Sequence, residues 1–442
     1  MMDGVGHCDL TRLTAAEALR LMADGRLTAH ALVSASLERI HRRDGDVRAW
    51  LALSETALEQ AERCDALPVG QRGRLHGLPI AIKDVFDTVD LPTTHNSPLY
   101  QGFRPAADAA VVGLLLSEGA IILGKTDTTE FAAAGRDAAT GNPHDLSRTP
   151  GGSSAGSAAA VADFHVPLAL ATQTGGSTIR PASFCGIVGF KPSFGRVSRE
   201  GAKIYAQSFD TVGWYGRSVE DVGLLAAVLG LDEPRDDRPL PAQLRVGVTS
   251  GPYADRLAPE SRLALELSKA RLENAGHKVE VLELPLEFSE LDRHHRVILH
   301  REGQAAFRNL ARRHGSLLHD DFHHRVENRD GSTLSDLARA YDAMALGRIS
   351  FDHLMQDFDV VIAPSAPGFA PVGRRPGDPV FNASWTLLGV PCLNLPTPLD
   401  APSLPIGVTL IAARFDDRSL LESARILEAV LNPQESSRYR NA

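Results

Sequence analysis

The sequence predicts an α/β fold, in which strands and helices alternate along the chain, and two observations carry this prediction. In the first, a run of small residues at 158–162 predicts a helix, and the apolar run at 166–171 that follows predicts a buried strand. In the second, a strand at 244–248, an amphipathic helix at 259–275 and a strand at 279–284 follow one another. This succession is typical of two parallel strands joined by a helix in one sheet.

The other elements are predicted from caps, apolar spacing and turn residues. Thr14 and Glu17 form a capping box that opens a short helix, which Gly25 ends, and Thr28 caps a second helix that runs to about residue 42. The remaining predicted elements are a strand at 49–53, a helix at 55–66, a strand that ends at Lys83, a helix at 108–117, a strand at 119–126, a helix at 221–229, a surface loop at 232–241, a strand at 360–363, a helix or turn at 385–390, strands near 393–395 and 408–411, and a closing helix at 418–431.

Composition and charge limit the class of protein that this chain can be. The 442 residues are 43% hydrophobic and 23% charged, which is ordinary for a globular protein with a large core. The net charge of −9 argues against a nucleic-acid partner, whose binding surface needs basic residues. No apolar run is long enough to cross a membrane, the N-terminus lacks the pattern of a secretory signal, and the four cysteines are scattered. We therefore expect a cytoplasmic protein that binds neither nucleic acid nor membrane.

Two glycine-serine clusters, at 151–157 and 175–177, form the first candidate site. Glycine allows backbone N–H groups to approach a bound atom without a Cβ in the way. The residues whose N–H groups can therefore line an oxyanion hole beside the Ser177 hydroxyl are Thr174, Gly175, Gly176 and Ser177 itself. The alternative is an ordinary surface turn, but two such clusters in one region favour a site.

A serine nucleophile needs a base, because its hydroxyl reacts poorly at neutral pH. The chain lacks the GxSxG pattern of Ser-His-Asp hydrolases, and the other candidate base is Lys83. Lys83 ends an apolar, strand-like run, where loss of water disfavours the ammonium form and leaves an amine that can accept a proton. The alternative is a lysine at a strand end whose ammonium extends to solvent.

Two further patterns resemble sites but fail a physical test. The segment GAIILGKT at 119–126 matches the phosphate-loop pattern, but its apolar β-branched run predicts a straight buried strand instead. Histidines gather at 294–324, where His319 and His323 are spaced to share a helix face. A metal would need a third ligand and a positioned carboxylate, and Asp320 stands where the zinc-protease motif has Glu. We expect no metal and no cofactor.

Several motifs, taken in chain order, resemble one known family. They are GLPIAIKD at 77–84, GAIILGKTDTTEFA at 119–132, PGGSSAGSAAAVA at 150–162, TQTGGSTIRPASFCGIVGFKPS at 172–193, FDVVIAPSAP at 358–367 and FNASWTLLGVPCLNLP at 381–396. Over most of the chain they closely resemble the amidase signature family of Ser-cisSer-Lys amide hydrolases. The resemblance implies a single α/β domain over residues 1–442, with a central mixed β-sheet flanked by helices on both faces. It also implies a signature core at 70–215 and a variable, specificity-determining region at 286–380.

Carried over to this chain, the family's catalytic roles fall on three residues. Ser177 is the implied nucleophile and Lys83 the implied general base. Ser153 is the implied relay between them, and the peptide bond before it is implied to be cis. The positions implied to support this group are Ser154 and Thr172, through hydrogen bonds, and Asp210, which braces the loops. The segment at 385–390 is expected to pack near the nucleophile.

Two positions depart from the common family pattern. Gln173 stands where many members have Asp, and Arg180 lies three residues after Ser177 rather than two. This form is similar to that of malonamidases, in which the Arg is associated with a carboxylate of the substrate, and an Arg fork suits a carboxylate. The alternative for Arg180 is an ion pair with an internal Asp or Glu, and both interpretations stay open at this point.

The resemblance implies an amidohydrolase that cleaves the C–N bond of a small carboxamide, anilide or urea-type substrate through a seryl acyl-enzyme and releases ammonia or an amine. The alternative is the amidase subunit of a tRNA-dependent amidotransferase, which supplies ammonia to a partner. Gln173 and the unfamiliar sequence at 286–350 count against that alternative. Exposed N-terminal helices serve as dimer contacts in some family members, so a homodimer is a further expectation.

Overall fold

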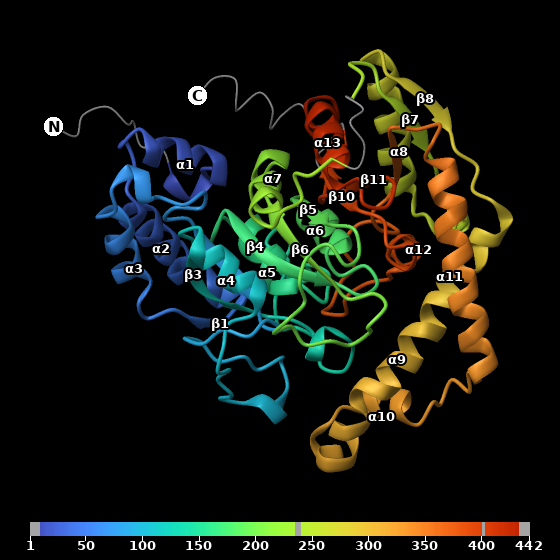
Figure 1. Ribbon diagram of the computed structural model, residues 1–442, viewed down its shortest axis with the longest axis horizontal. Helices are drawn as coiled ribbons and strands as arrows, with labels where there is room; N and C mark the ends of the chain where they lie inside the picture. Colours follow the sequence, from blue (N-terminus) through green and yellow to red (C-terminus); the bar gives the residue numbers. More distant parts are fainter. Residues whose placement is uncertain (1–8, 235–239, 400–402, 433–442) are drawn as a thin grey trace.

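One mixed sheet runs through the middle of the molecule (Figure 1), and the structure, a computed structural model, describes residues 9–234, 240–399 and 403–432. Its strands are β1 (Trp50–Leu53), β2 (Pro79–Lys83), β3 (Ile121–Thr126), β4 (Leu168–Gln173), β5 (Val188–Lys191), β6 (Thr211–Gly216), β7 (Arg245–Val248), β8 (Lys278–Val281), β9 (Val360–Pro364), β10 (Cys392–Pro396) and β11 (Gly407–Ile411). Within the described residues these 11 strands lie in the order β1-β3-β2-β4-β6-β5-β10-β11-β9-β7-β8.

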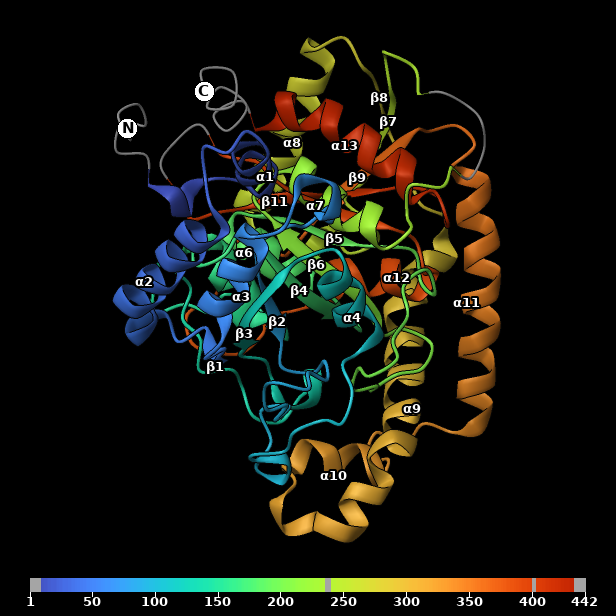
Figure 2. The same cartoon turned by 60° about the vertical axis from the view of Figure 1, so that its left-hand side comes forward.

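Helices pack along this sheet, and further helices lie to the side of it. They are α1 (Ala15–Ala23), α2 (Ala29–Val47), α3 (Ala57–Asp65), α4 (Ala110–Ser117), α5 (Ala155–Ala162), α6 (Ile179–Cys185), α7 (Val219–Val228), α8 (Pro259–Asn274), α9 (Leu291–His314), α10 (Asp320–Val326), α11 (Leu334–Leu354), α12 (Val380–Leu388) and α13 (Asp417–Leu431). Figure 2 shows α2 and α3 on the left, beside the β1 end of the sheet, and α9 and α11 on the opposite side of the molecule. The predicted α/β fold with a mixed sheet is confirmed.

The centre of the sheet is where the sequence is most apolar. Strand β2 pairs in parallel with β3 on one side and β4 on the other, and every residue of the three strands is buried. Strands buried on both faces lack an alternating pattern, which is why they appear in the sequence as continuous apolar runs. The predicted parallel pair β7 and β8 is confirmed, with α8 between them in the chain.

The N-terminal helices begin where their caps predict. The Thr14 and Glu17 capping box is present at the start of α1, and the Thr28 hydroxyl accepts from the N–H of Ala31 at the start of α2. The predicted end of α2 near residue 42 is wrong, because the helix continues to Val47. Tertiary contacts extend it: Val47 is buried, and the side chain of Arg43 is bonded to Asp163.

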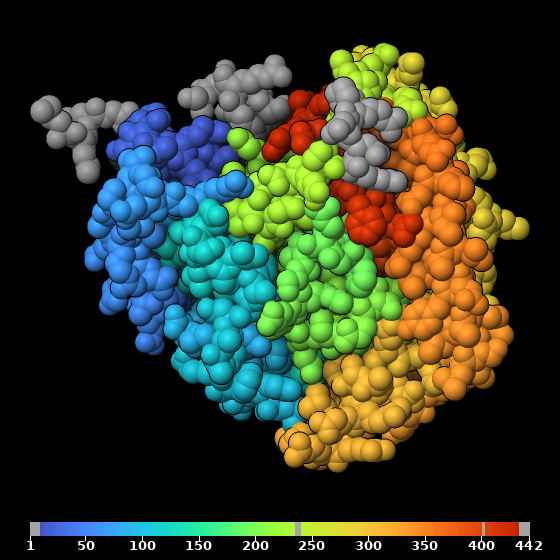
Figure 3. All heavy atoms as spheres, viewed as in Figure 1, coloured from blue at the N-terminus to red at the C-terminus, as the bar shows by residue number. Residues whose placement is uncertain are grey.

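The segment after β8 forms three helices that local pattern did not predict. α9 packs against α10, α11 and α12, and together α9, α10 and α11 form one side of the face shown in the space-filling view (Figure 3). The expectation that His319 and His323 share a helix face is wrong, because His319 is the extended N-cap residue of α10. The predicted helix at 385–390 begins earlier, at Val380. Residues 235–239 of the predicted surface loop lie outside the described residues.

The phosphate-loop-like segment forms a buried strand, as predicted, although its pairing with β2 shifts register between Ile122 and Gly124. It forms β3, where all six residues are buried. The Lys125 ammonium lies 3.0 Å from a carboxylate oxygen of Asp84, and both side chains are fully buried. Burial lowers the pKa of Lys125, and the Asp84 charge opposes that shift. Lys125 therefore ties β3 to the chain that follows β2 and is not available to a phosphate.

Breaking this pair should destabilise the fold. Asp84→Ala leaves a buried ammonium without its carboxylate, and we expect a loss of about 3–5 kcal/mol in the free energy of unfolding. The double variant Asp84→Ala with Lys125→Met removes both charges and should lose less than Asp84→Ala alone. Chemical denaturation measures both. Glu422→Ala, which breaks the exposed pair with Arg418, is the control and should cost about 0–1 kcal/mol. Equal stability of Asp84→Ala and wild type would contradict the assignment of Asp84 and Lys125 as a buried ion pair.

Candidate active site

Lys83 is the centre of a buried group of hydroxyls. It ends β2, it is 0% exposed, and its Nζ lies 2.8 Å from Ser153 Oγ, 2.9 Å from Ser154 Oγ and 2.7 Å from Thr172 Oγ1. Two features of the fold bring these residues together. β2 and β4 are parallel neighbours, so Lys83 and Thr172 lie near the same edge of the sheet, and Ser153 and Ser154 directly precede α5, which packs on both strands. The alternative in which the Lys83 ammonium extends to solvent is wrong.

The surroundings of Lys83 disfavour its charged form. Burial lowers the pKa of Lys83 well below 10.5, and the negative charge of Asp210 opposes this shift more weakly. A neutral amine has two N–H donors and one lone pair. Ser154 Oγ donates to the Thr172 carbonyl at 3.1 Å, so toward Lys83 it accepts. With its second N–H on Thr172 Oγ1, the amine can direct its lone pair at the Ser153 hydroxyl.

The peptide bond between Gly152 and Ser153 is cis, as the resemblance predicts. The Gly152 carbonyl accepts a hydrogen bond of 2.6 Å from Nη2 of Arg180. Gly151, one residue earlier, has a φ of +84°, and a Cβ there would lie 2.9 Å from the Cα of Pro181. The first glycine-serine cluster is thus fixed against the start of α6, which directly follows the second cluster.

The second cluster is a loop whose carbonyl groups are bonded and whose N–H groups are not. The Thr174 carbonyl accepts from His295 Nε2 at 2.8 Å, and the Gly175 carbonyl accepts from Thr386 Oγ1 at 2.6 Å. The Gly176 carbonyl accepts from the N–H of Arg180, and the Ser177 carbonyl accepts from the Tyr215 hydroxyl. Throughout the described chain the N–H groups of residues 175–177 have no hydrogen-bond acceptor. Unpaired backbone N–H groups beside a serine hydroxyl are the kind of donor from which an oxyanion hole is built.

Sequence reasoning anticipated most of this group but missed three members. The structure brings Lys83, Ser153, Ser154 and Thr172 into contact, and Ser177, which carries the last of the unpaired N–H groups, is 8% exposed. Within the described residues Ser177 Oγ makes no hydrogen bond to Ser153 or Lys83. The members that sequence reasoning missed are His295, Thr386 and Tyr215. Only Thr386 had a signal, because the segment at 385–390 was expected near the nucleophile.

Gln173 and Asp210 hold the loop from its two sides. Gln173 Oε1 accepts from the N–H groups of Thr178, at 2.9 Å, and Ile179, at 3.0 Å, and its Nε2 donates to Thr386. An Asp in this place would accept but would not donate. Asp210 accepts from Thr174 Oγ1 at 2.6 Å and from two backbone N–H groups, and burial raises the pKa of its carboxyl to about 6.

Arg180 is buried without a carboxylate partner. It is 3% exposed, and in the described part of the chain its Nε and Nη1 have no hydrogen-bond partner and the side chain forms no ion pair. Burial lowers the pKa of Arg180 to about 10, and Asp378 opposes this shift. A Cβ added to Gly176 would lie 3.2 Å from Nη1, so the guanidinium lies against the loop that carries Ser177.

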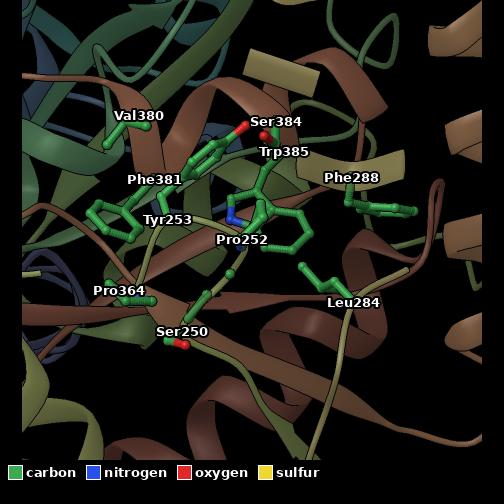
Figure 4. Close-up of a pocket in the computed structure, with 12 residues that line it drawn as sticks. Ser250, Pro252, Tyr253, Leu284, Phe288, Pro364, Val380, Phe381, Ser384 and Trp385 are labelled. Carbon is green, nitrogen blue, oxygen red and sulfur yellow. The ribbon is translucent and has the colours of Figure 1, made fainter. Parts of the chain in front are cut away.

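A small pocket adjoins this group and is lined by Thr172, Thr174, Asp210 and Lys203 among others. A second small pocket is apolar, and its walls include Tyr253, Phe288, Phe381 and Trp385 (Figure 4). Phe381 and Trp385 belong to α12, the helix whose Thr386 bonds the glycine loop.

Among the residues that the structure describes, no group of three or more His, Cys, Asp or Glu side chains is placed to hold a metal. The helices of that same part include none with the length and apolar character to cross a membrane.

Comparisons with known proteins agree on one family. The family model named Amidase matches residues 31–421. The chain is 34% identical to a glutamyl-tRNA(Gln) amidotransferase subunit from Anaeromyxobacter sp. (strain K), over 96% of this chain and 97% of that protein. It is similar in structure to an amidase, with a TM-score of 0.84 and 31% identity over 95% of this chain and 100% of that one. It is also similar to a chain from a vestigial protein complex that bears on the origins of an s-triazine catabolic enzyme, with a TM-score of 0.85 and 29% identity over 94% and 98% of the two chains.

Fold, site and comparisons together define a hydrolase that acts on C–N bonds. The chain belongs to the amidase signature family.

Thr172 tests the bonding of the buried amine. Thr172→Val keeps the shape of the side chain but leaves one Lys83 N–H without an acceptor, and we expect a loss of about 1–3 kcal/mol in the free energy of unfolding. Thr172→Ser keeps the hydroxyl and should lose less than half as much. Denaturation at pH 8 measures both variants. If the Val and Ser variants are equally stable, the Thr172 hydroxyl does not stabilise the Lys83 amine by accepting its N–H.

Proposed function

We propose that this protein hydrolyses the C–N bond of a small carboxamide, anilide or urea-type compound through a seryl acyl-enzyme. Ser177 is the nucleophile, Ser153 relays the proton and Lys83 is the base. The observation that carries this proposal is the buried Lys83 amine, whose lone pair can point at Ser153 while its N–H groups are taken by Ser154 and Thr172. Such an amine can accept a proton at neutral pH.

In the proposed reaction, Ser177 Oγ attacks the carbonyl carbon while its proton passes to Ser153, whose own proton passes to Lys83. The negative oxygen of the tetrahedral intermediate binds to the unpaired N–H groups of residues 175–177. The proton returns from Lys83 through Ser153 to the nitrogen, the C–N bond breaks, and ammonia or an amine leaves. Water then attacks the acyl-enzyme by the same relay and releases the acid.

Arg180 points to a substrate class within this activity. Its guanidinium has unpaired nitrogens in a buried position, and the alternative of an internal ion pair finds no support among the described residues. An unpaired buried cation next to the catalytic loop is suited to an anion that the substrate brings. We therefore include in the proposal that the substrate carries a carboxylate close to the scissile amide, as the resemblance to malonamidases implies. Residues 286–380 would shape the rest of the pocket, because α9 contributes His295 to the loop.

The curated relatives favour a second candidate. Those at 31–36% identity are named as subunits of glutamyl-tRNA(Gln) amidotransferase, which implies that they work with partners. Hydrolysis of L-glutamine separates the two candidates. A chain that hydrolyses L-glutamine faster than any small amide in a panel, or only when partner subunits are added, would support the amidotransferase role. Turnover of small amides by the chain alone supports the hydrolase.

Removal of the proposed catalytic groups should nearly abolish turnover. We expect Lys83→Ala and Ser177→Ala each to lower kcat by a factor on the order of 10²–10⁴ or more, because a general base alone contributes about that much. A fluorophosphonate should label Ser177 in the wild type and leave Ser177→Ala unlabelled, as peptide mass mapping would show. Ser117→Ala, at an exposed serine, is the matched control. More than about a tenth of the wild-type rate in Lys83→Ala would remove Lys83 from the role of base.

The substrate charge can be tested on the wild-type enzyme. An ω-amido acid should have a kcat/KM about 10–100-fold above that of its neutral diamide, because a hydrogen-bonded charge contributes about 1.5–3 kcal/mol. Arg180→Lys keeps the charge but loses the fork, and it should lower this preference. Equal kcat/KM for the two wild-type substrates would discard the carboxylate contact.

A further inference from the structure

The direction of each N–H group in the catalytic loop is fixed by the carbonyl before it. In a planar trans peptide the C=O of one residue and the N–H of the next point in opposite directions. A donor that holds the Thr174 carbonyl therefore aims the Gly175 N–H away from itself, and a donor on the Gly175 carbonyl aims the Gly176 N–H. The side chains that hold these two carbonyls, at 2.8 Å and 2.6 Å, are His295 and Thr386.

His295 reaches the loop from α9. Its ring is buried and stacked on Phe209, with 4.4 Å between centroids and 19° between planes. Burial lowers the pKa of His295 to about 4, so at neutral pH the ring is neutral. Since the Thr174 carbonyl can only accept, the ring hydrogen lies on Nε2. The Thr174 hydroxyl is bonded to Asp210, so this residue is held at both its side chain and its carbonyl.

Thr386 reaches the loop from α12, and Gln173 decides which way its hydroxyl points. Gln173 Oε1 accepts from two backbone N–H groups, so its Nε2 must face Thr386, where it donates at 3.0 Å. Thr386 Oγ1 has one hydrogen, which can go to the Gly175 carbonyl at 2.6 Å or to the Asn382 carbonyl at 3.1 Å. The shorter contact is the one to the loop.

We propose that His295 and Thr386 are positioning residues of the oxyanion hole, which aim the N–H groups of Gly175 and Gly176 at the developing oxyanion. This inference rests on the proposed function. Neither side chain is assigned a contact with the substrate. Their effect should therefore fall on the transition state, where the oxyanion has formed, and not on the bound substrate. Both come from segments that lie more than 100 residues from the loop in sequence, with separations of 121 and 211 residues.

The test compares variants that lose the donor with variants that keep it. His295→Leu and Thr386→Val should lower kcat about 10–100-fold, somewhat less than the loss of an oxyanion-hole donor itself, and should change KM less than about threefold. His295→Gln, whose amide nitrogen reaches the place of Nε2, and Thr386→Ser should stay within about threefold of wild type in kcat.

A second measurement distinguishes a change in the direction of the N–H groups from general damage to the fold. A boronic acid matched to the acyl part of the best substrate forms a tetrahedral adduct on Ser177 with an oxygen in the hole. Its affinity should fall in parallel with kcat in His295→Leu and Thr386→Val and recover in His295→Gln and Thr386→Ser. Thermal unfolding of all four variants is measured alongside.

The outcomes distinguish this inference from the proposed function beneath it. If the wild type turns over no amide in the panel and binds no boronic acid, the proposed function fails. If the wild type is active and His295→Leu and His295→Gln lose kcat equally, or if the losses appear in KM alone, the positioning role is wrong.

Discussion

The site depends on the removal of one amine from water. Lys83 lies at the end of a strand that is covered on both faces and paired on both edges, so its side chain has only the local hydroxyls as partners. Burial disfavours the ammonium form, and among the described residues no carboxylate contacts the amine to restore it. This environment supports the proposal that Lys83 is the base, with its two N–H groups on Ser154 and Thr172 and its lone pair toward Ser153.

A neighbouring lysine shows that burial alone does not make a base. Lys125 lies on β3, directly beside β2, and is buried to the same degree as Lys83. Its ammonium contacts Asp84, a charged partner that favours the protonated form, and it also donates to the Phe86 carbonyl. The same residue type thus serves as a structural cation in one strand and is suited to proton transfer in the next. What differs is that the Lys125 side chain contacts a carboxylate and the Lys83 side chain, among the described residues, does not.

The sequence predicted the parts of the fold in which local pattern and tertiary environment agree. β2, β3 and β4 are continuous apolar runs, and α1 carries a complete capping box. Helix α9 was not predicted, because it is rich in Arg and His and lacks a clear apolar stripe, and its contacts with α10, α11 and α12 stabilise it. The end of α2 was missed for the same reason, since Arg43 and Val47 are held by distant residues.

The contrast between local sequence and tertiary contacts also applies to the site: its proposed catalytic groups follow from local sequence, and the directions of its N–H groups depend on tertiary contacts. The proposed catalytic residues Lys83, Ser153 and Ser177 could be predicted by motif because their local sequence carries the turns and strands that present them. The direction of the N–H groups depends on His295 and Thr386, which are single residues in helices without any motif of their own. Gln173 links the motif that carries Ser177 to the distant helix α12, because its amide both holds the start of α6 and orients the Thr386 hydroxyl. An Asp at 173 has a shorter side chain and no N–H to donate, so it could not reproduce the bond from Gln173 to Thr386. Gln173 and Thr386 are therefore linked through one hydrogen bond, although 213 residues separate them.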